Sequence, residues 1–398
     1  MGLPTEIAAL EVNALPLRAY NLIWNEWFRD QNLQDSITVN TDDGPDADTD
    51  YSLKKRAKKH DYFTSALPFP QKGDAVTLPL GTTAPVWGTG DPIRVDSTSL
   101  SGAIMRSTVA GPGNMITSTT PVGTENLSFQ GPGGTNALYA DLSAATAATI
   151  NQLRQAFMVQ SLLELDARGG TRYVEIIKAH FNVVSPDFRL QRPEFLSGGS
   201  TQISQHPVAQ TSESNTTAQA SLAAFSTSSN MGNNIGFSKS FTEHGYVIGM
   251  GQARADITYQ QGLNKMWSRQ TRYDFFWPKL QELGEQTILN KEIYAQGTTA
   301  DEDVFGYQER YAEYRYKPSE IRGQFRSNFA TPLDVWHLAE EFSTLPALNG
   351  TFIESSTPIE RSLVVAAGYP HLLFDAFFKY KHARPILTYG VPATLGRF

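Results

Sequence analysis

The sequence predicts a mainly β fold, a β-sandwich or jelly roll with long loop insertions and a few short helices. Its 398 residues include 22 Phe, 16 Tyr, 31 Gly and 22 Pro, a composition typical of strands joined by many turns. Segments that alternate apolar and polar residues recur in the C-terminal half, whereas clear helix signals are few. No fixed-period repeat is present, which argues against solenoids and propellers.

The strongest strand pattern lies in residues 371–381, where every second residue from Leu372 to Tyr380 is apolar. Residues 311–318 and 245–260 alternate in a similar way. Successive side chains of a strand point to opposite faces, so this pattern favours strands with one face buried. We expect the core strands to come mainly from about 236–327 and 360–395, with helices confined to loops.

One helix is well marked after residue 149. Thr149 and Gln152 form a capping box in front of it, and Gly169-Gly170 supplies a stop. A second helix is expected to start at Thr331-Pro332, with Pro at the first helical position. The apolar residues of the first helix form two adjoining rows: Ile150, Leu153 and Phe157, then Met158, Leu162 and Leu165.

The sequence lacks the usual marks of an enzyme. It has no Cys, which excludes disulfides and thiolate chemistry. It also has no phosphate-binding loop, nucleophile elbow, zinc-protease or dinucleotide motif. We therefore expect no catalytic residues, no cofactor and no metal site. The acids between Asp42 and Asp50 lack the ligand rhythm of a calcium loop, and binding of a hard cation there is left open.

The main electrostatic feature is a basic run just after those acids. The formal net charge of −7 argues against nucleic-acid binding over the whole surface, but not against a local basic patch. The flanking rings of Tyr51, Tyr62 and Phe63 would be available to stack on unpaired bases while the cations meet phosphates. The alternative is a solvated loop whose cations pair with the preceding acids. The predicted DNA-binding residues are Lys54, Lys55, Arg56, Lys58 and Lys59.

Residues 82–148 form a long segment that is poor in charge. Such a segment inside a compact chain is typically functional or disordered. We divide the chain into an N-terminal part with the basic loop (1–81), this insertion (82–148) and the remainder (149–398). A second polar, low-charge stretch at 197–236 is expected to be a surface loop. The predicted inter-subunit or host contacts in the insertion are Trp87, Ile104, Met105, Met115 and Leu127.

Several blocks of the sequence are family-specific. They include NALPLRAYNLIWNEWFRDQNLQD at 13–35, RQAFMVQSLLELDARGGTRYVEIIKAHF at 154–181 and the C-terminal HLLFDAFFKYKHARPILTYGVPATLGRF at 371–398. In this order, they resemble the major capsid proteins of gokushoviruses, small single-stranded DNA phages of the microvirus family. Family members normally carry a further N-terminal stretch before the first block. The resemblance therefore implies that the first barrel strands are missing here, which would leave a sheet edge or core face exposed.

The resemblance implies an eight-stranded antiparallel jelly roll that assembles into the smallest icosahedral shell around single-stranded DNA. Segment 82–148 would match the family's protrusion at the threefold axes, which is thought to touch the host. The expected location is the virion, after assembly in the host bacterial cytoplasm. The implied partners are copies of the chain, the genome, a host cell-surface receptor, and three virion proteins: internal scaffolding, DNA pilot and small basic DNA-binding.

Two other functions compete with the shell subunit. The first is a jelly-roll adhesin that holds host glycans with segment 82–148. The second is a jelly-roll enzyme such as a glycoside hydrolase. An adhesin should show one concave aromatic groove, and an enzyme a cleft with convergent carboxylates. A shell subunit should instead present several large contact faces. The lack of a catalytic motif ranks the enzyme last.

Overall fold

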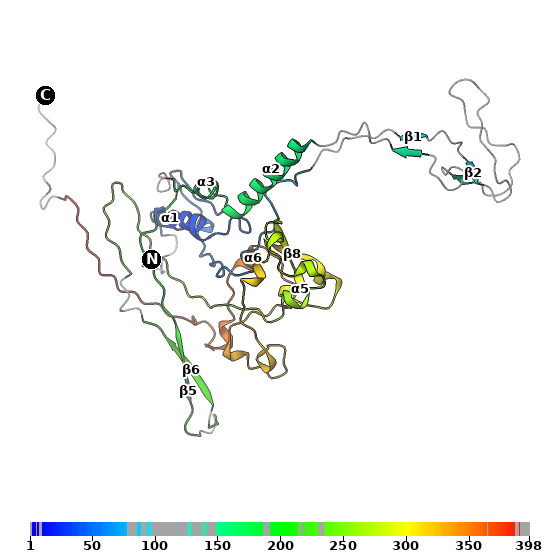
Figure 1. Cartoon of the computed structure of the whole chain (residues 1–398). Helices are drawn as coiled ribbons and strands as arrows, with labels where there is room; N and C mark the ends of the chain where they lie inside the picture. Colours follow the sequence, from blue (N-terminus) through cyan, green and yellow to red (C-terminus); the bar gives the residue numbers. More distant parts are fainter. Residues whose placement is uncertain are drawn as a thin grey trace, which may run out of the picture.

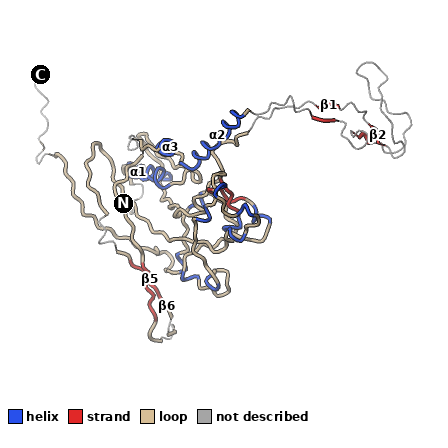
Figure 2. The backbone as a smooth tube through the Cα atoms, in the orientation of Figure 1, coloured by secondary structure: helices blue, strands red, loops and turns tan. Residues whose placement is uncertain are grey.

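The fold is seen in a computed structural model of the whole chain (Figure 1). It describes residues 2–77 without 5, 8 and 9, four short strands between 86 and 140, residues 149–185, residues 192–229 without 214, 215, 217 and 220, residues 235–386 without 364, and residue 390. Most of the described chain is neither helix nor strand (Figure 2). Long irregular segments extend from one packed region (Figure 1).

The packed region is built around one antiparallel hairpin. Strand β7 (Glu285–Leu289) pairs with β8 (Val304–Glu309), and the register shifts between Ile288 and Leu289. Helix α5 (Asn290–Ile293) directly follows β7, and helix α6 (Gly350–Ile353) contributes two further buried side chains. Isolated bridges join the N-terminal segment to this region, at Ala57 with Glu354 and at Leu67 with Tyr307.

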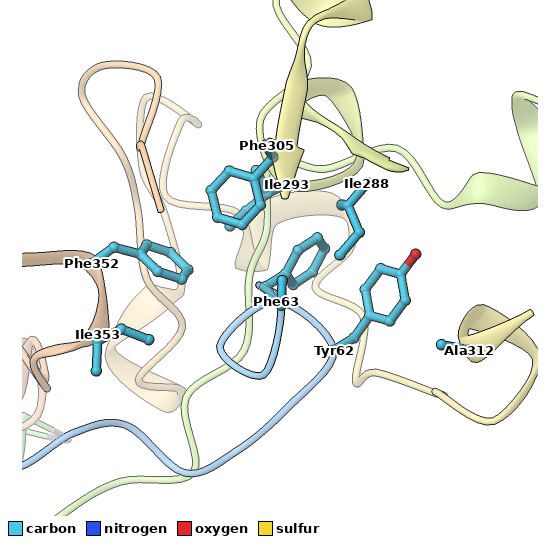
Figure 3. Close-up of a cluster of buried hydrophobic side chains, with 9 residues drawn as sticks. Tyr62, Phe63, Ile288, Ile293, Phe305, Ala312, Phe352 and Ile353 are labelled. Carbon is cyan, nitrogen blue, oxygen red and sulfur yellow. The ribbon is translucent and has the colours of Figure 1, made fainter. Parts of the chain in front are cut away.

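Aromatic and aliphatic side chains from distant parts of the sequence form the core (Figure 3). The ring of Phe63 meets the rings of Tyr259 and Phe305 edge to face, with centroids 5.2 and 6.1 Å apart, a favoured aromatic geometry. The cluster draws on four segments of the chain, 62–66, 288–293, 305–312 and 352–353. Because burial of apolar surface is the main stabilising term in folding, the cluster holds these segments together. Its buried members are Tyr62, Phe63, Ala66, Ile288, Ile293, Phe305, Ala312, Phe352 and Ile353.

The predicted helix after residue 149 is confirmed. Helix α2 (Ile150–Gly169) starts at the capping box, where the backbone N–H of Gln152 donates to Oγ1 of Thr149 and the backbone N–H of Thr149 donates to Oε1 of Gln152. Helix α3 (Tyr173–Phe181) packs back on α2. Gly169 is required there, because an added Cβ would lie 2.4 Å from the Cβ of Ala179.

The remaining elements are short. Helix α1 (Leu15–Ile23) continues into a π-helical turn, η1 (Trp24–Phe28). Strand β1 (Val86–Gly88) pairs with β4 (Leu138–Ala140), β2 (Arg94–Asp96) with β3 (Asn126–Ser128), and β5 (Ser204–Ala209) with β6 (Leu222–Thr227), all antiparallel. Among the described residues no helix is long and apolar enough to cross a membrane. Single-turn 3₁₀ helices lie at Asp48–Asp50, Lys265–Trp267, Arg272–Asp274, Pro278–Leu280, Thr299–Glu302, Ala312–Tyr314, Gly323–Phe325, Asp334–Trp336 and Ile359–Arg361.

Three segments predicted as strands form no ladder in the single chain. Segments 245–260 and 371–381 are extended but form no ladder, apart from a bridge between Tyr259 and Glu340. Residues Ala312–Tyr314 form a 3₁₀ turn, entered through Tyr311 at φ 65°. Alternation decides which side chains share a face, but a strand also needs a neighbouring backbone to bond. The mostly non-helical character is as predicted, whereas the described strands form four separate pairs instead of one eight-stranded barrel.

Two further local predictions are corrected. The helix expected from Thr331 is only the single turn Asp334–Trp336, because His337 is extended at φ −145° and ψ 163°. The segment 197–236, expected to be a loop, contains the hairpin of β5 and β6, and all six residues of β5 are exposed. The sequence carries the local mark of a helix start at Thr331-Pro332 and a loop-like composition at 197–236. In both segments the backbone hydrogen bonds of the folded chain give a different structure.

We expect Ile288→Ala to lower the free energy of unfolding by about 3 kcal/mol, because it leaves a cavity among packed rings. Ile288 is fully buried, with 0% of its surface exposed. Urea unfolding followed by Trp fluorescence measures the loss. Val304→Ala, at a half-exposed position on the partner strand, is the matched control and should cost less than about 1 kcal/mol. Equal losses in both variants would contradict the core assignment.

Candidate nucleic-acid interface and assembly surfaces

The basic run lies along the edge of the core as an extended segment. The backbone N–H of Lys58 donates to the carbonyl of Ile353, and the N–H of Ser355 donates to the carbonyl of Arg56. These two hydrogen bonds clamp the run against the end of α6. Side chains alternate along an extended chain, so neighbouring cations of the run have different surroundings.

Lys58 points into the core. Its ammonium lies 2.6 Å from Oε2 of Glu340, and the two side chains are 5% and 8% exposed. The same ammonium lies 4.3 Å from the centroid of the Phe352 ring, a cation–π contact. Burial raises the pKa of the Glu340 carboxyl, and the charge of Lys58 opposes that shift. In this structure Lys58 is a core residue, out of reach of a phosphate backbone.

The other predicted cations lie on the surface. Lys59 is exposed and pairs with Asp256 at 3.3 Å, in high dielectric where such a pair is weak. Lys54, Lys55 and Arg56 are exposed, and in the part of the chain that the structure describes none of them has a carboxylate partner. The guanidinium of Arg56 stacks over the ring of Phe28, 5.2 Å from its centroid.

Arg254 joins this surface from a distant part of the sequence. Partial burial, and then the positive charge of Arg254, lowers the pKa of Arg56. Arg254 is exposed and forms no ion pair among the described residues. Sequence reasoning missed it, because a single Arg within an alternating segment carries no local signal. We call Lys54, Lys55, Arg56 and Arg254 the basic surface.

The acids that precede the run do not neutralise it. Asp46 binds Arg18 in a bidentate pair and accepts the hydroxyl of Tyr51. These hydrogen bonds from Arg18 and Tyr51 lower the pKa of Asp46 to about 2. Asp50 accepts from the side chain of Asn40 at 2.9 Å. The pairing expected from the solvated-loop alternative is therefore absent from the described contacts, and no cluster of metal-ligating side chains is found among the described residues.

The aromatic partners predicted for stacking on bases are mostly inside the core. Tyr62 and Phe63 are each 6% exposed, so the prediction that they are available to unpaired bases is wrong. Their place in the sequence, directly after the cations, does not predict their burial. The chain turns inward after His60, and the carboxylate of Asp61 caps that turn by accepting from the backbone N–H groups of Phe63 and Thr64.

The predicted contact residues of the insertion are mostly outside the described residues. Ile104, Met105 and Met115 lie outside them. Trp87 lies in β1 and Leu127 in β3, within the two paired ladders of the insertion. Their role as contacts remains a prediction.

The described residues expose many large apolar side chains. Leu373 and Phe377 in the C-terminal segment are 91% and 93% exposed, and Phe374 and Phe378 beside them are 84% and 78% exposed. Exposed apolar side chains gathered along one segment mark a contact site for other macromolecules.

Comparison with known proteins decides the family. Residues 1–394 match the phage family described as "Capsid protein (F protein)". The chain belongs to this capsid family. It is 63% identical over 413 aligned positions to capsid protein VP1 of Bdellovibrio phage phiMH2K, covering all of this chain and 76% of that protein. It is 40% identical to VP1 of Chlamydia phage 1, covering 98% of this chain and 76% of that protein. It is 37% identical to VP1 of Spiroplasma virus 4, covering 98% and 75%.

The capsid chain is therefore a structural protein of the virion, a major capsid subunit of a microvirus. The resemblance noted from the sequence is confirmed. A capsid protein assembles with copies of itself, and contacts between copies bury apolar surface that a single chain exposes. The adhesin alternative is not favoured by the family or by its relatives.

We expect Lys58→Met to lower the free energy of unfolding by about 3 kcal/mol, because it leaves the carboxylate of Glu340 buried without its partner. Chemical denaturation of the capsid chain measures this loss. Lys55→Met, on the exposed part of the same run, is the matched control and should change stability by less than about 0.5 kcal/mol. A Lys58→Met variant as stable as this control would contradict the buried ion pair and would place Lys58 on the surface with the other cations.

Proposed function

We propose that the chain is the repeating subunit of a small icosahedral shell that encloses single-stranded DNA, with the basic surface on the inner side. One observation carries the proposal. Lys54, Lys55 and Arg56 are consecutive and exposed, the charge of Arg254 acts on Arg56, and none of the four has a carboxylate partner among the described residues, on a chain whose net charge is −7. Unpaired cations held close together repel one another, so an anionic ligand that binds there relieves the repulsion.

Single-stranded DNA fits the chemistry of this surface. Its phosphates pair with cations and release condensed counterions, which gives binding that depends on salt and not on sequence. Phe28 is half-buried beneath Arg56, so it orients the guanidinium and is not itself a free stacking platform. The proposed mode is therefore phosphate contact, with base stacking playing a small part.

We also propose that the jelly roll is completed in the assembled shell. The two extended segments 245–260 and 371–381 already approach each other, since a Cβ on Gly251 would lie 3.6 Å from the Phe374 ring. Both carry alternating apolar residues, and apart from the bridge between Tyr259 and Glu340 neither pairs with another backbone segment among the described residues. Pairing of such segments within or between copies would satisfy their N–H and C=O groups. This accounts for a strand pattern in the sequence that forms no ladder in the single chain.

The remaining proposals concern partners. The insertion 82–148 would form the outward protrusion and contact the host receptor. Its support is a low charge content and two nested strand pairs, β1 with β4 and β2 with β3, which lie apart from the core (Figure 1). Scaffolding, pilot and small basic DNA-binding proteins, and assembly in the host cytoplasm, follow from the family resemblance.

For the basic surface, we expect neutralisation to flatten the salt dependence of DNA binding. Replacing Lys54, Lys55, Arg56 and Arg254 with Gln should reduce the slope of log K against log salt by up to about 3, at about 0.7 per cation. Fluorescence anisotropy with an oligo-dT strand measures the slope. The control is Arg315→Gln with Arg322→Gln, two exposed guanidinium groups already paired with Glu309 and Glu320. A slope that stays unchanged in the fourfold variant contradicts the proposal.

For the insertion, we expect that replacing residues 100–130 with a short Gly-Ser linker abolishes adsorption to host cells. The reason is that the segment would present the receptor contact. Phage adsorption rate measures the effect, and electron microscopy shows whether shells still form. Shells that form and adsorb at the normal rate would place the host contact elsewhere. A Gly-Ser replacement of similar length in the hairpin loop 210–220 is the control.

A further inference from the structure

The N-terminal half of helix α2 presents an apolar row that the described part of the chain does not cover. Ile150, Leu153 and Phe157 follow one another at spacings of three and four residues, so they lie on one face. Ile150 is 70% exposed and Phe157 is 66% exposed. The neighbouring Met158 is 73% exposed. The helix thus exposes its largest apolar side chains where it lies furthest from the core.

The two halves of α2 have different environments. At the C-terminal end, Arg168 pairs with Glu285 of β7 and the helix packs against α3. Near the N-terminal end, all residues except Ala156 from Ile150 to Val159 are exposed. Ten helical residues with no packed face are only marginally stable in water. The capping box at Thr149 fixes where the helix starts, but it does not cover the apolar row.

The side chains of this half of α2 favour another copy of the same helix as its packing partner. The spacing Ile150, Leu153, Phe157 matches the a, d, a positions of a coiled-coil seam. Arg154 is the single charged residue between Ile150 and Leu163, and it follows Leu153 at the flanking e position. Its long side chain can reach water from there. Two such rows can therefore face each other without like charges in the seam.

The position of the helix supports the same partner. In Figure 1, α2 leads from the packed region toward β1 and β2, so its N-terminal half is not enclosed by the core. A capsid chain is surrounded by copies of itself, and an interface across a twofold axis brings the same surface patch of both copies together. We propose that the row Ile150, Leu153 and Phe157 packs against the same row of α2 in a second copy of this chain. The proposal rests on the shell-forming role of the family and is independent of the proposed DNA contact.

Cross-linking tests the proposal directly, because the chain contains no native Cys. Shells are assembled from the full chain carrying Phe157→Cys and treated with a short bismaleimide. We expect covalent dimers of the chain on a denaturing gel. Gln155→Cys is the matched control: at about 100° per residue it lies on the opposite side of the helix and should give at least tenfold less dimer. Intact shells with no excess of dimer at position 157 over position 155 would overturn the proposal.

A second variant guards against a folding artefact. Leu153→Gln with Phe157→Gln should reduce shell yield at least tenfold, since it places amides in the seam. The unassembled variant should keep the circular dichroism and denaturation midpoint of the parent chain. Asn151→Ala with Gln155→Ala, on the polar side of the same half, should assemble normally. Normal shell yield from the Leu153→Gln, Phe157→Gln variant would overturn the proposal, and that result does not depend on DNA binding.

Discussion

The packed region depends on the contact between the segment around Lys58 and the segment around Glu340. The ion pair between these two residues is buried, and the rings of Tyr62 and Phe63 enter the core immediately after it. A buried ion pair is a poor source of net stability, but a broken one is costly, so the pair acts mainly to fix the register of the two segments. The bridge between Ala57 and Glu354 holds the same N-terminal segment against the end of α6. The remaining cations of the run lie on the surface.

Local signals in the sequence predict the structure where the contacts themselves are local. The capping box at Thr149 and the Gly169-Gly170 stop define α2, because hydrogen bonds within the helix satisfy its backbone. The strand pattern at 371–381 shows the opposite limit. Its alternation is real, but among the described residues its backbone has no partner strand. The pattern could predict which side chains share a face but not the ladder.

The candidate site shows the same limit in its electrostatics. A run of cations in the sequence is visible, but burial separates Lys58 from Lys54 and Lys55 within four residues. Arg254, about two hundred residues further along the chain, lies close enough to Arg56 for its charge to act on it, and no local sequence pattern predicts this proximity. The acids before the run looked like its counterions, and Arg18 takes the carboxylate of Asp46 instead. Which charges meet is set by tertiary packing. The function was more accessible, because whole blocks of sequence resemble one family.

The core has a consequence for the timing of synthesis. Lys58 and Glu340 are 282 residues apart in the chain, and Phe352 and Ile353 come later still. At a translation rate of about 5–20 residues per second, the N-terminal part of the core waits roughly a quarter of a minute to a minute for its last partners. During that interval Tyr62 and Phe63 are exposed on the nascent chain. The core of this subunit is therefore completed only when the last third of the sequence emerges, and until then its N-terminal aromatic residues lack their packing partners.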